Sequence, residues 1–540
     1  MPLHAGFRRH RLGRETLMRS VCLFTWTLVV AAPAWAIADT DQEGAMLQAV
    51  VEYADNVLRL GRDADTPLFA DGLHVDTRQP AEFQGWSLSN LADQQNFFRV
   101  LTGLTRLTGD PRYANAAREA IAWHFERQHP SGLLNWGHHR LIDLRTHEVV
   151  GDSGRVHELK MNFPFYELMW EVDTEATERF LRGFWARHVA DFRTLNFNRH
   201  GSFSGGDPGD IWDREFAGPE PFYATGNLTF INTGADLIQA AAVLSKYSGD
   251  ERPLDWALRM AGMFRRTRHP ETRLTAYQFT RRDPDRGVQQ FGDDFGDRAL
   301  EGKILVRYKG ETIYGYVAVL RMRLAEELGD AGEELLQWAH DDLLAYARYA
   351  YDPETHTIRP LLTDGTDLTG YRLKRNGYHG RAGTVFEPWE AGSIHLLAYA
   401  LGYRLTGDAA LWETARAMAR GHGLGELGRT PGRAARLDLE TDNADPHALL
   451  ALLELHRAGG GSAYLDLATR IGENILAKKF HRGFFLHSED HVVASFNSLE
   501  PLALLSLEAA RRGAPEAVPA YNGGGDYMHT RINRAAAQTR

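Results

Sequence analysis

A recurring pattern of two helices joined by a short turn constrains the fold more than any other feature of the sequence. In each copy an apolar helix ends in a short Gly/Asp turn, and a second helix follows. Glycine suits the left-handed end of a helix, and aspartate suits the cap of the next one. The copies lie at Leu107–Asp110, Tyr247–Asp250, Leu328–Asp330, Leu405–Asp408 and Ala458–Tyr464, with less regular versions at Trp170–Asp173 and Ala510–Gly513.

The copies of this pattern predict about seven helix pairs. Pairs that cannot bury their faces alone must stack, as an open solenoid or as a closed ring. The irregular spacing of the copies argues against a solenoid of equal repeats. No Ser/Pro-rich or low-complexity linker divides residues 45–510, so we expect one domain. The sequence therefore predicts an all-α dominated fold, a closed (α/α) barrel with long irregular loops and minor β structure.

The first 36 residues are typical of a secretory signal peptide. Five arginines precede an apolar run from Val21 to Ala32, and Ala34-Trp35-Ala36 is a small-x-small cleavage site. The run is too short to span a membrane as a mature helix. The only cysteine, Cys22, lies inside this leader, so we expect no disulfide or thiolate in the mature chain. We therefore expect a periplasmic or secreted protein without a membrane anchor.

The charge of the chain argues against nucleic-acid binding. The net charge is −10, and it falls to about −14 without the five Arg and one Glu of the leader. An acidic protein gains no long-range attraction to a polyanion, so any polyanion must bind in a local basic cleft.

Three segments hold an unusual density of groups that bind metals or move protons. They read Trp136-Gly-His-His-Arg140, Val156-His-Glu-Leu-Lys160 and Asn196-Phe-Asn-Arg-His-Gly201. Two imidazoles and one carboxylate suit zinc or a first-row transition metal, with positions left open for substrate. The alternative is a set of ordinary loop or core histidines, because the chain has 23 His and no H-x-x-x-H spacing lies nearby.

The three segments resemble the corresponding motifs of family 2 polysaccharide lyases, which are pectate lyases with an (α/α)7 barrel. The likeness continues through most of the chain, from about residue 70 to residue 510. Further matching segments are Asp293–Phe295, Leu362–Thr366, Tyr399–Thr406 and Asn474–Ala477. We expect the barrel to span residues 37–525 and a C-terminal tail to occupy residues 526–540.

The resemblance implies roles for individual residues. The metal ligands would be His139, Glu158 and His200. The base would be Arg199, which directly precedes the second histidine ligand. His138 competes with His139 for the first ligand position, because this chain has His-His before Arg140. The expected substrate contacts are Lys160, Tyr277 and Lys303. The expected metal is Mn²⁺, and Ni²⁺, Co²⁺ or Zn²⁺ would also suit this ligand set.

The implied reaction is β-elimination across 1,4-linked uronates of polygalacturonate or oligogalacturonates, which gives unsaturated oligogalacturonides. We expect the enzyme to act as a monomer. Removing the C5 proton develops a second negative charge beside the uronate carboxylate, and a divalent metal lowers that cost. An arginine can act as a base only when its guanidinium has lost a proton, and guanidinium is ordinarily protonated. Arg199 could instead stabilise the charge while another group takes the proton, and the sequence leaves both roles open.

Four insertions that we predict to be non-helical lie between the helix pairs, at residues 130–160, 196–228, 269–311 and 360–390. The first two carry the metal-site motifs. The last two are rich in cations and aromatic residues, which suit sugar rings and their carboxylates. Their acidic residues are interpreted as loop acids, with calcium binding as the alternative; they are Asp293, Asp294, Asp364 and Asp367.

Two other functions compete with the lyase. An (α/α)-barrel glycoside hydrolase acting on uronate-containing oligosaccharides would need paired carboxylates. Its candidates cluster in one loop, at Asp207, Asp210, Asp213 and Glu215. A non-catalytic carbohydrate-binding barrel would not need the three metal ligands or Arg199, and all four residues are intact.

Overall fold

The computed structural model describes residues 40–137, 139–151, 156–488 and 491–525. The predicted leader, the predicted tail and His138 lie outside the described residues. The chain from Gln42 onward forms one compact unit, to which the following description applies. The domain boundaries at 37–525 stay a prediction.

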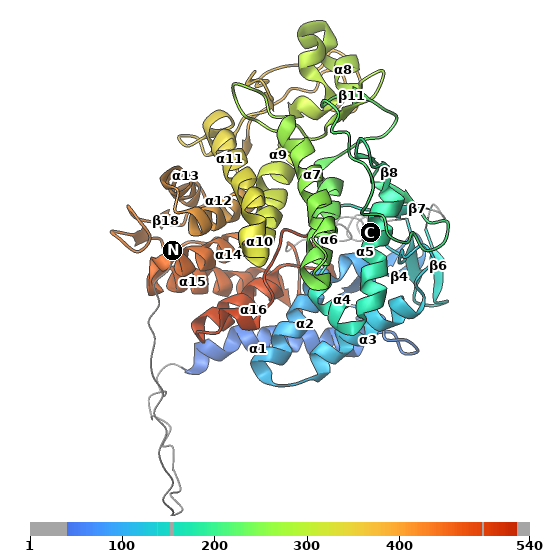
Figure 1. Ribbon diagram of the computed structural model, residues 1–540. Coiled ribbons are helices and arrows are strands. Elements are labelled where there is room, and N and C mark those ends of the chain that lie inside the picture. Colours follow the sequence, from blue (N-terminus) through green and yellow to red (C-terminus); the bar gives the residue numbers. More distant parts are fainter. Residues whose placement is uncertain (1–39, 138, 152–155, 489–490, 526–540) are drawn as a thin grey trace, which may run out of the picture. The chain divides into compact units, whose positions relative to one another are not determined.

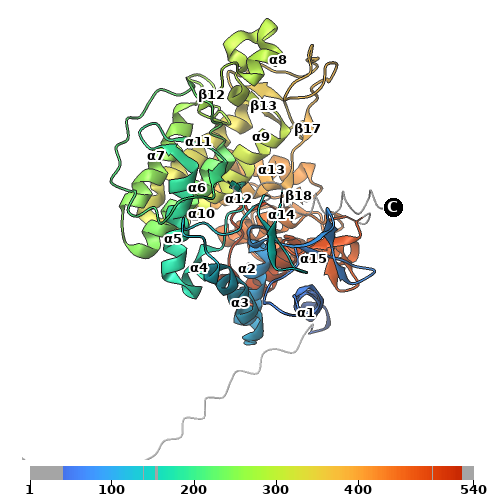
Figure 2. The same ribbon diagram turned by 90° about the vertical axis from the view of Figure 1, so that its right-hand side faces the viewer.

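Fourteen helices of the described residues form seven pairs, each with one inner and one outer helix (Figures 1 and 2). The inner helices are α2 (Gln95–Thr108), α4 (Tyr166–Val172), α6 (Ile231–Ser248), α10 (Val317–Leu328), α12 (Ser393–Thr406), α14 (Pro446–Leu455) and α16 (Glu500–Arg511). The outer helices are α1 (Thr40–Asn56), α3 (Arg112–Glu126), α5 (Thr174–His188), α7 (Arg252–Arg266), α11 (Glu333–Tyr349), α13 (Ala409–Gly421) and α15 (Ser462–Lys479).

The pairs close into a ring because the last inner helix packs against the first. Contacts run from α6 through α10, α12, α14 and α16 back to α2, and α3, α4 and α5 connect α2 to α6. In Figure 1 the red helix α16 accordingly lies beside the blue helix α2. The inner helices are apolar almost all round, as in Leu449–Leu455 of α14, because both of their faces are buried. The predicted (α/α)7 fold class is confirmed.

The turns between inner and outer helices have the predicted chemistry. Gly109, Gly249 and Gly407 end α2, α6 and α12 with φ between 69° and 77°, a conformation that suits glycine. Asp408 then caps α13, where its Oδ1 accepts hydrogen bonds from the amides of Ala410 and Leu411 at 2.7 and 3.3 Å.

The β-strands of the described residues all lie in the connections that lead from an outer helix to the next inner helix. One sheet contains β1 (Gly72–His74), β2 (Gln79–Pro80) and β22 (Val493–Ser495), another contains β3 (Glu82–Phe83), β4 (Trp86–Ser89), β5 (Leu141–Asp143) and β6 (Glu148–Val150), and a third contains β14 (Tyr351–Asp352), β15 (Thr357–Ile358) and β17 (Trp389–Glu390). Two-stranded ladders join β7 (Val156–Glu158) to β10 (His200–Ser202), β8 (Val189–Asp191) to β9 (Asn196–Phe197), β11 (Tyr223–Ala224) to β12 (Thr280–Arg281), β13 (Ile304–Leu305) to β16 (Leu361–Leu362), β18 (Gly425–Glu426) to β19 (Arg436–Leu437) and β20 (Phe480–His481) to β21 (Phe484–Phe485).

This arrangement gives the barrel two different ends. Helices of a pair run antiparallel, so all outer-to-inner connections emerge at the end where the inner helices begin. In the described part of the chain, the opposite end carries the short inner-to-outer turns and the start of the segment that follows α16. The elaborated end is therefore the end that can hold a functional site.

The segment 269–311 differs from its prediction, because it contains a helix. Helix α8 (Arg286–Phe295) begins at Asp285, whose Oδ1 accepts hydrogen bonds from the amides of Gly287 and Val288 at 2.9 and 3.1 Å. Phe291 on its buried face packs against Tyr371 and Phe386. A short helix α9 (Arg307–Glu311) follows. The many Gly, Asp and Arg residues of this segment are the reason that the apolar stripe of α8 was not recognised in the sequence.

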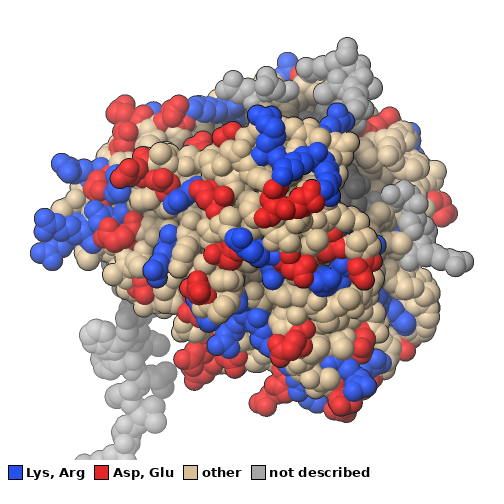
Figure 3. Space-filling model, turned by 90° about the horizontal axis from the view of Figure 1, so that it is seen from above, with Lys and Arg blue, Asp and Glu red and all other residues tan. Residues whose placement is uncertain are grey.

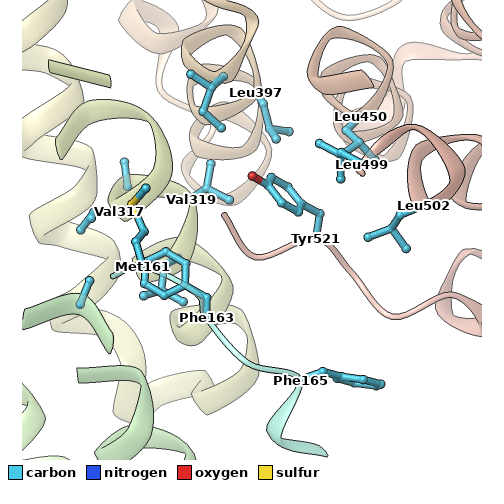
Figure 4. Packing of buried hydrophobic residues seen from close by; sticks show 14 of the residues in the cluster. Met161, Phe163, Phe165, Val317, Val319, Leu397, Leu450, Leu499, Leu502 and Tyr521 are labelled. Carbon is cyan, nitrogen blue, oxygen red and sulfur yellow. The ribbon is translucent and has the colours of Figure 1, made fainter. Parts of the chain in front are cut away.

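The C-terminal part of the described chain enters the core beside the connection to α4. Figure 4 shows Tyr521 among Leu450, Leu499 and Leu502, with Met161 and Phe163 on the neighbouring connection. Arg323 of α10 donates from Nε to the carbonyl of Tyr521 at 3.2 Å. Asn522 of this segment donates from Nδ2 to the carbonyl of Phe163 at 3.1 Å, just before α4, which is the shortest inner helix.

Candidate metal centre and active site

A two-stranded ladder brings the second and third sequence motifs together. Strands β7 and β10 are antiparallel, and their register places His200 directly opposite Glu158. Facing residues of such a ladder have Cβ atoms about 4.5–5.5 Å apart. Leu159 extends the pairing, because its amide donates to the carbonyl of Arg199 at 3.0 Å.

His139 joins this pair from the loop before β5. Its Nε2 lies 3.8 Å from Oε2 of Glu158, and Nε2 of His200 lies 3.6 Å from Oε1 of the same carboxylate. One ligand atom from each of the three residues lies within 4.8 Å of the others. Ligands of one ion at about 2.0–2.2 Å lie about 3–4 Å apart, so the set can hold a metal after a small closure.

The three side chains of the triad differ in how far they are exposed to solvent. The side chain of Glu158 is 2% exposed, that of His139 is 19% exposed and that of His200 is 39% exposed. A buried carboxylate with an exposed imidazole leaves one side of the site open to solvent, as a catalytic site requires. His138, the competing ligand, lies outside the described residues.

Arg199 lies against the triad. Its Nη2 is 3.5 Å from Oε1 of Glu158, and its Nε donates to Nε2 of His200 at 3.2 Å. Its side chain is 37% exposed, so the guanidinium also faces solvent. Among the described residues, Glu158 is the only carboxylate within 4 Å of this guanidinium.

A chain of two buried histidines supports the ladder from behind. Nδ1 of His188 lies 2.8 Å from the carbonyl of Asn198, and Nε2 of His188 lies 2.8 Å from Nδ1 of His157. The carbonyl only accepts, so Nδ1 of His188 donates to it, and His157 donates to Nε2 of His188. Burial lowers the pKa of His188 to about 4 and the pKa of His157 well below its usual range, so both rings are neutral.

Gly201 makes room for this histidine chain. A Cβ at this position of β10 would lie 2.6 to 2.9 Å from three atoms of the His188 ring. Any larger residue would push the ladder away from α5, which carries His188. Asn198 fixes the other end of the motif, because its Oδ1 accepts from the amide of His200 at 3.0 Å.

Asp236 of α6 holds the turn that follows β7. Its buried carboxylate accepts hydrogen bonds from the amides of Met161, Asn162 and Phe163 at 2.6, 3.2 and 3.4 Å. Met161 and Phe163 have φ values of 59° and 45°, in the left-handed region that non-glycine residues rarely adopt. Burial raises the pKa of Asp236 to about 7, and the amide hydrogen bonds oppose that rise.

The structure brings the predicted ligands His139, Glu158 and His200 together beside Arg199, and their roles stay predictions. The sequence analysis missed the residues that support them. His188, Asp236 and Gly201 carry no motif of their own, because their roles depend on contacts between distant segments. A signal was present only at Gly201, which directly follows the Arg-His pair.

Comparison with known proteins places this geometry in a family. A family model described as periplasmic pectate lyase matches residues 66–531, which is most of the chain. The chain belongs to this pectate lyase family. A pectate disaccharide-lyase of Dickeya dadantii (strain 3937) is 31% identical over 516 residues, which cover 89% of this chain and 92% of the relative.

Solved structures that share helical architecture with this pectate lyase are distant. A D-mannose isomerase matches with a TM-score of 0.45 and 13% identity, over 78% of this chain and 100% of that chain. An α-1,6-mannanase of Salegentibacter sp. HEL1_6 matches with a TM-score of 0.40 and 11% identity, over 86% of this chain and 99% of that chain.

The family establishes the coarse function. The protein is an enzyme of the polysaccharide lyase class, its substrate is an oligosaccharide or polysaccharide, and its family is described as periplasmic. The predicted resemblance is thereby confirmed. No helix among the described residues is long and apolar enough to cross a membrane.

The predicted substrate contacts of this pectate lyase lie at different depths. Lys160 is half-buried, two residues after Glu158. Tyr277 is buried, and Arg199 is close enough to act on its pKa, which burial raises. Lys303 has its Nζ 4.5 Å from the ring centre of Phe222, and burial lowers its pKa. These three roles stay predictions.

The four carboxylates that a hydrolase would need are exposed, and three of them lie against arginines, whereas Asp207 accepts from the amide of Gly209 at 2.8 Å. Asp210 and Asp213 each accept a hydrogen bond from Nη1 of Arg252 at 3.0 Å, and Glu215 lies 3.4 Å from Arg193. A general acid requires a carboxyl that keeps its proton, and ion pairing opposes this. The hydrolase alternative is not favoured.

Three of the four loop acids of the 269–311 and 360–390 segments also have basic partners, and the fourth, Asp367, accepts from the amide of Thr369 at 2.8 Å. Asp294 pairs with Lys374 at 2.5 Å, Asp293 pairs with Arg375, and Asp364 pairs with Arg298 at 2.6 Å. Among the described residues, the only group with metal-site geometry is His139, Glu158 and His200. Figure 3 shows acidic and basic side chains interspersed over one face of the molecule.

Proposed function

We propose that this pectate lyase cleaves polygalacturonate or oligogalacturonates by metal-assisted β-elimination and releases unsaturated oligogalacturonides. The observation that carries the proposal is the convergence of His139, Glu158, His200 and Arg199 on one open site, in a chain of the pectate lyase family. The name of the Dickeya relative, pectate disaccharide-lyase, supports a product of two sugars. Both the family description and the name of the relative contain the word pectate, which supports polygalacturonate as the substrate class.

The donor set fits a divalent first-row metal. Two imidazoles and one buried carboxylate provide the borderline ligands that Mn²⁺, Ni²⁺, Co²⁺ or Zn²⁺ accept, and we propose Mn²⁺. When bound, the metal would act as a Lewis acid on the uronate carboxylate. The buried histidine chain and Asp236 keep the ladder that carries Glu158 and His200 in place.

Arg199 would take the C5 proton of the uronate. Its exposed guanidinium lies beside the triad, on the side open to solvent. A guanidinium must lose its charge to accept a proton, and a metal cation held by Glu158 would favour that loss. Lys160, Tyr277 and Lys303 would bind the uronate units, since ammonium groups pair with carboxylates and the tyrosine hydroxyl can hydrogen-bond.

We further propose that residues 1–36 direct the chain to the periplasm and are removed. The mature monomer would then consist of one catalytic domain at residues 37–525 and a tail at residues 526–540. Mass spectrometry of the exported protein would show the N-terminus that cleavage after Ala36 predicts.

The proposed function is tested by the absorbance of the unsaturated product. Chelated enzyme is given polygalacturonate, first without metal and then with Mn²⁺. We expect absorbance to rise only with metal, and to disappear in His200→Ala. The matched control is His481→Ala, which removes an exposed histidine of β20 and should leave the rate unchanged.

Other results would reject parts of the proposal. New reducing ends without absorbance would indicate hydrolysis. A rate that is the same in His200→Ala would remove the triad from the reaction. Products longer than two sugars throughout the time course would contradict disaccharide release.

A further inference from the structure

The guanidinium of Arg199 contacts one atom on each of two triad residues, and both atoms can serve as metal ligands. Its Nε donates to Nε2 of His200 at 3.2 Å, and its Nη2 lies 3.5 Å from Oε1 of Glu158. The same Oε1 lies 3.6 Å from Nε2 of His200. The guanidinium therefore bridges two of the three groups that form the triad.

One of these contacts cannot coexist with metal ligation. The Nε2 atom of a neutral imidazole has a single lone pair, which can accept one hydrogen bond or bind one metal. The hydrogen bond from Arg199 uses that lone pair. A guanidinium is also a full positive charge, so it repels a second cation that approaches the same carboxylate oxygen.

We propose that Arg199 and the metal compete for Nε2 of His200 and Oε1 of Glu158, so that metal binding releases the guanidinium. The inference rests on the proposed function, because it requires the triad to be the metal site. Among the described residues no other carboxylate lies within 4 Å of Arg199. With no other acidic partner among the described residues, the released Arg199 side chain would turn to the uronate substrate.

The competition implies that metal binding comes before the contact of Arg199 with substrate. Arg199 becomes available to substrate only after the metal has taken its partners. A group that draws the guanidinium away must in turn raise the affinity for the metal, because linkage between two sites is reciprocal. Arg199 would thus oppose metal binding and still be required for turnover.

Calorimetric titration of the metal-free full chain with Mn²⁺ and Zn²⁺ tests the competition. Arg199→Met keeps the aliphatic stem and removes the charge and both donors. We expect it to bind metal about tenfold tighter than the natural chain, the factor that ~1.4 kcal/mol represents and that one charge-assisted hydrogen bond supplies. Arg199→Met should have lost turnover at the same time.

Arg140→Met is the matched control. Arg140 follows the ligand His139, but its Nε donates to Asn135 at 3.0 Å and its guanidinium lies 3.9 Å from the ring centre of Phe203. Loss of a nearby charge without the direct contacts should tighten metal binding less than about threefold. Equal tightening in both variants would reduce the effect to general electrostatics and overturn the inference.

The remaining outcomes separate the inference from the proposed function. If the natural chain and Arg199→Met bind metal equally well, the competition is wrong and the metal site stands. If neither chain binds metal, both ideas fall. Circular dichroism and thermal unfolding of each variant establish that the chains are folded.

A second measurement observes the guanidinium itself. Arginine labelled with ¹⁵N gives an Nε–H signal for Arg199, which is assigned by its absence in Arg199→Met. We expect diamagnetic Zn²⁺ to move this signal from a hydrogen-bonded to a solvent-like position, and His200→Ala to place it there without Zn²⁺. A signal that is unchanged at Zn²⁺ saturation would overturn the release of Arg199.

Discussion

At the scale of single residues, Arg199 has two alternative roles, a base or a cation that stabilises the developing charge, and a substitution separates them. A base must accept a proton, and a lysine in its place would reach the site differently. We expect Arg199→Lys, with saturating Mn²⁺, to lose about 10²–10⁴-fold in kcat if Arg199 is the base. Near-normal kcat in this variant would favour the role of a cation that stabilises the developing charge. Stopped-flow absorbance of the unsaturated product measures the rate.

Gly201 provides a residue-scale test of the support behind the ladder. A methyl group there would meet the His188 ring at less than 3.0 Å. We expect Gly201→Ala to lower the free energy of unfolding by about 1–3 kcal/mol, as overpacking does, and to weaken Zn²⁺ binding. The matched control is Gly206→Ala in the same loop, where an added Cβ meets nothing within 4 Å.

Urea unfolding and calorimetry measure these two effects. If both glycine variants unfold at the same urea concentration and bind Zn²⁺ equally, the space behind β10 does not support the metal centre.

At the scale of elements, the turn after β7 depends on α6. Asp236 accepts three amide hydrogen bonds from a turn with two left-handed residues. Asp236→Ala leaves three buried donors without their acceptor, so we expect a loss of about 3 kcal/mol or more in unfolding free energy. Asp236→Asn keeps one oxygen acceptor, and its loss should be about 1 kcal/mol.

Urea unfolding of both variants, beside Asp255→Asn on the exposed face of α7, gives the comparison. An Ala variant that is no less stable than the Asn variant would show that the turn does not need these hydrogen bonds.

The element scale also shows what sequence can predict. Glycine and aspartate in the turns predict helix ends, because those residues act locally, and Gly109, Gly249 and Gly407 have that role. Glu158, Arg199 and His200 were found through resemblance of motifs. Asp236 was not found, because its partners are backbone amides 73 to 75 positions away. Backbone amides are not specific to any residue type, so they give no signal in a sequence.

At the scale of the whole molecule, the ring explains why the metal residues meet. His139, Glu158 and His200 belong to connections before α4 and α6, and both connections emerge at the elaborated end. The predicted helix pairs required this end to exist, but they did not fix which loops face each other. The register of β7 with β10 decides that, and three-residue strands give too weak a pattern to detect beforehand.

The stability of the whole molecule should fall in acid because several histidines are buried as neutral rings. Burial lowers the pKa of His124 to about 3, and those of His188 and His395 to about 4. Unfolded histidine titrates near 6.5, so between pH 6.5 and 4 the unfolded chain binds protons that the folded chain does not. Each histidine then lowers the unfolding free energy by up to about 1.4 kcal/mol per pH unit as pH falls.

Asp236 acts in the opposite direction, because its pKa is raised to about 7 and the folded chain takes up its proton first. Three histidines against one carboxyl leave a net loss of stability between pH 6.5 and 4.5. We compare the unfolding free energy as a function of pH, with a chelator present. In His124→Phe its slope should be shallower by about one proton, whereas in His481→Phe, on the surface, the slope should equal that of the natural chain. Urea unfolding at pH 6.5, 5.5 and 4.5 measures the slopes, and parallel lines for the three chains would mean that His124 is charged in the folded protein.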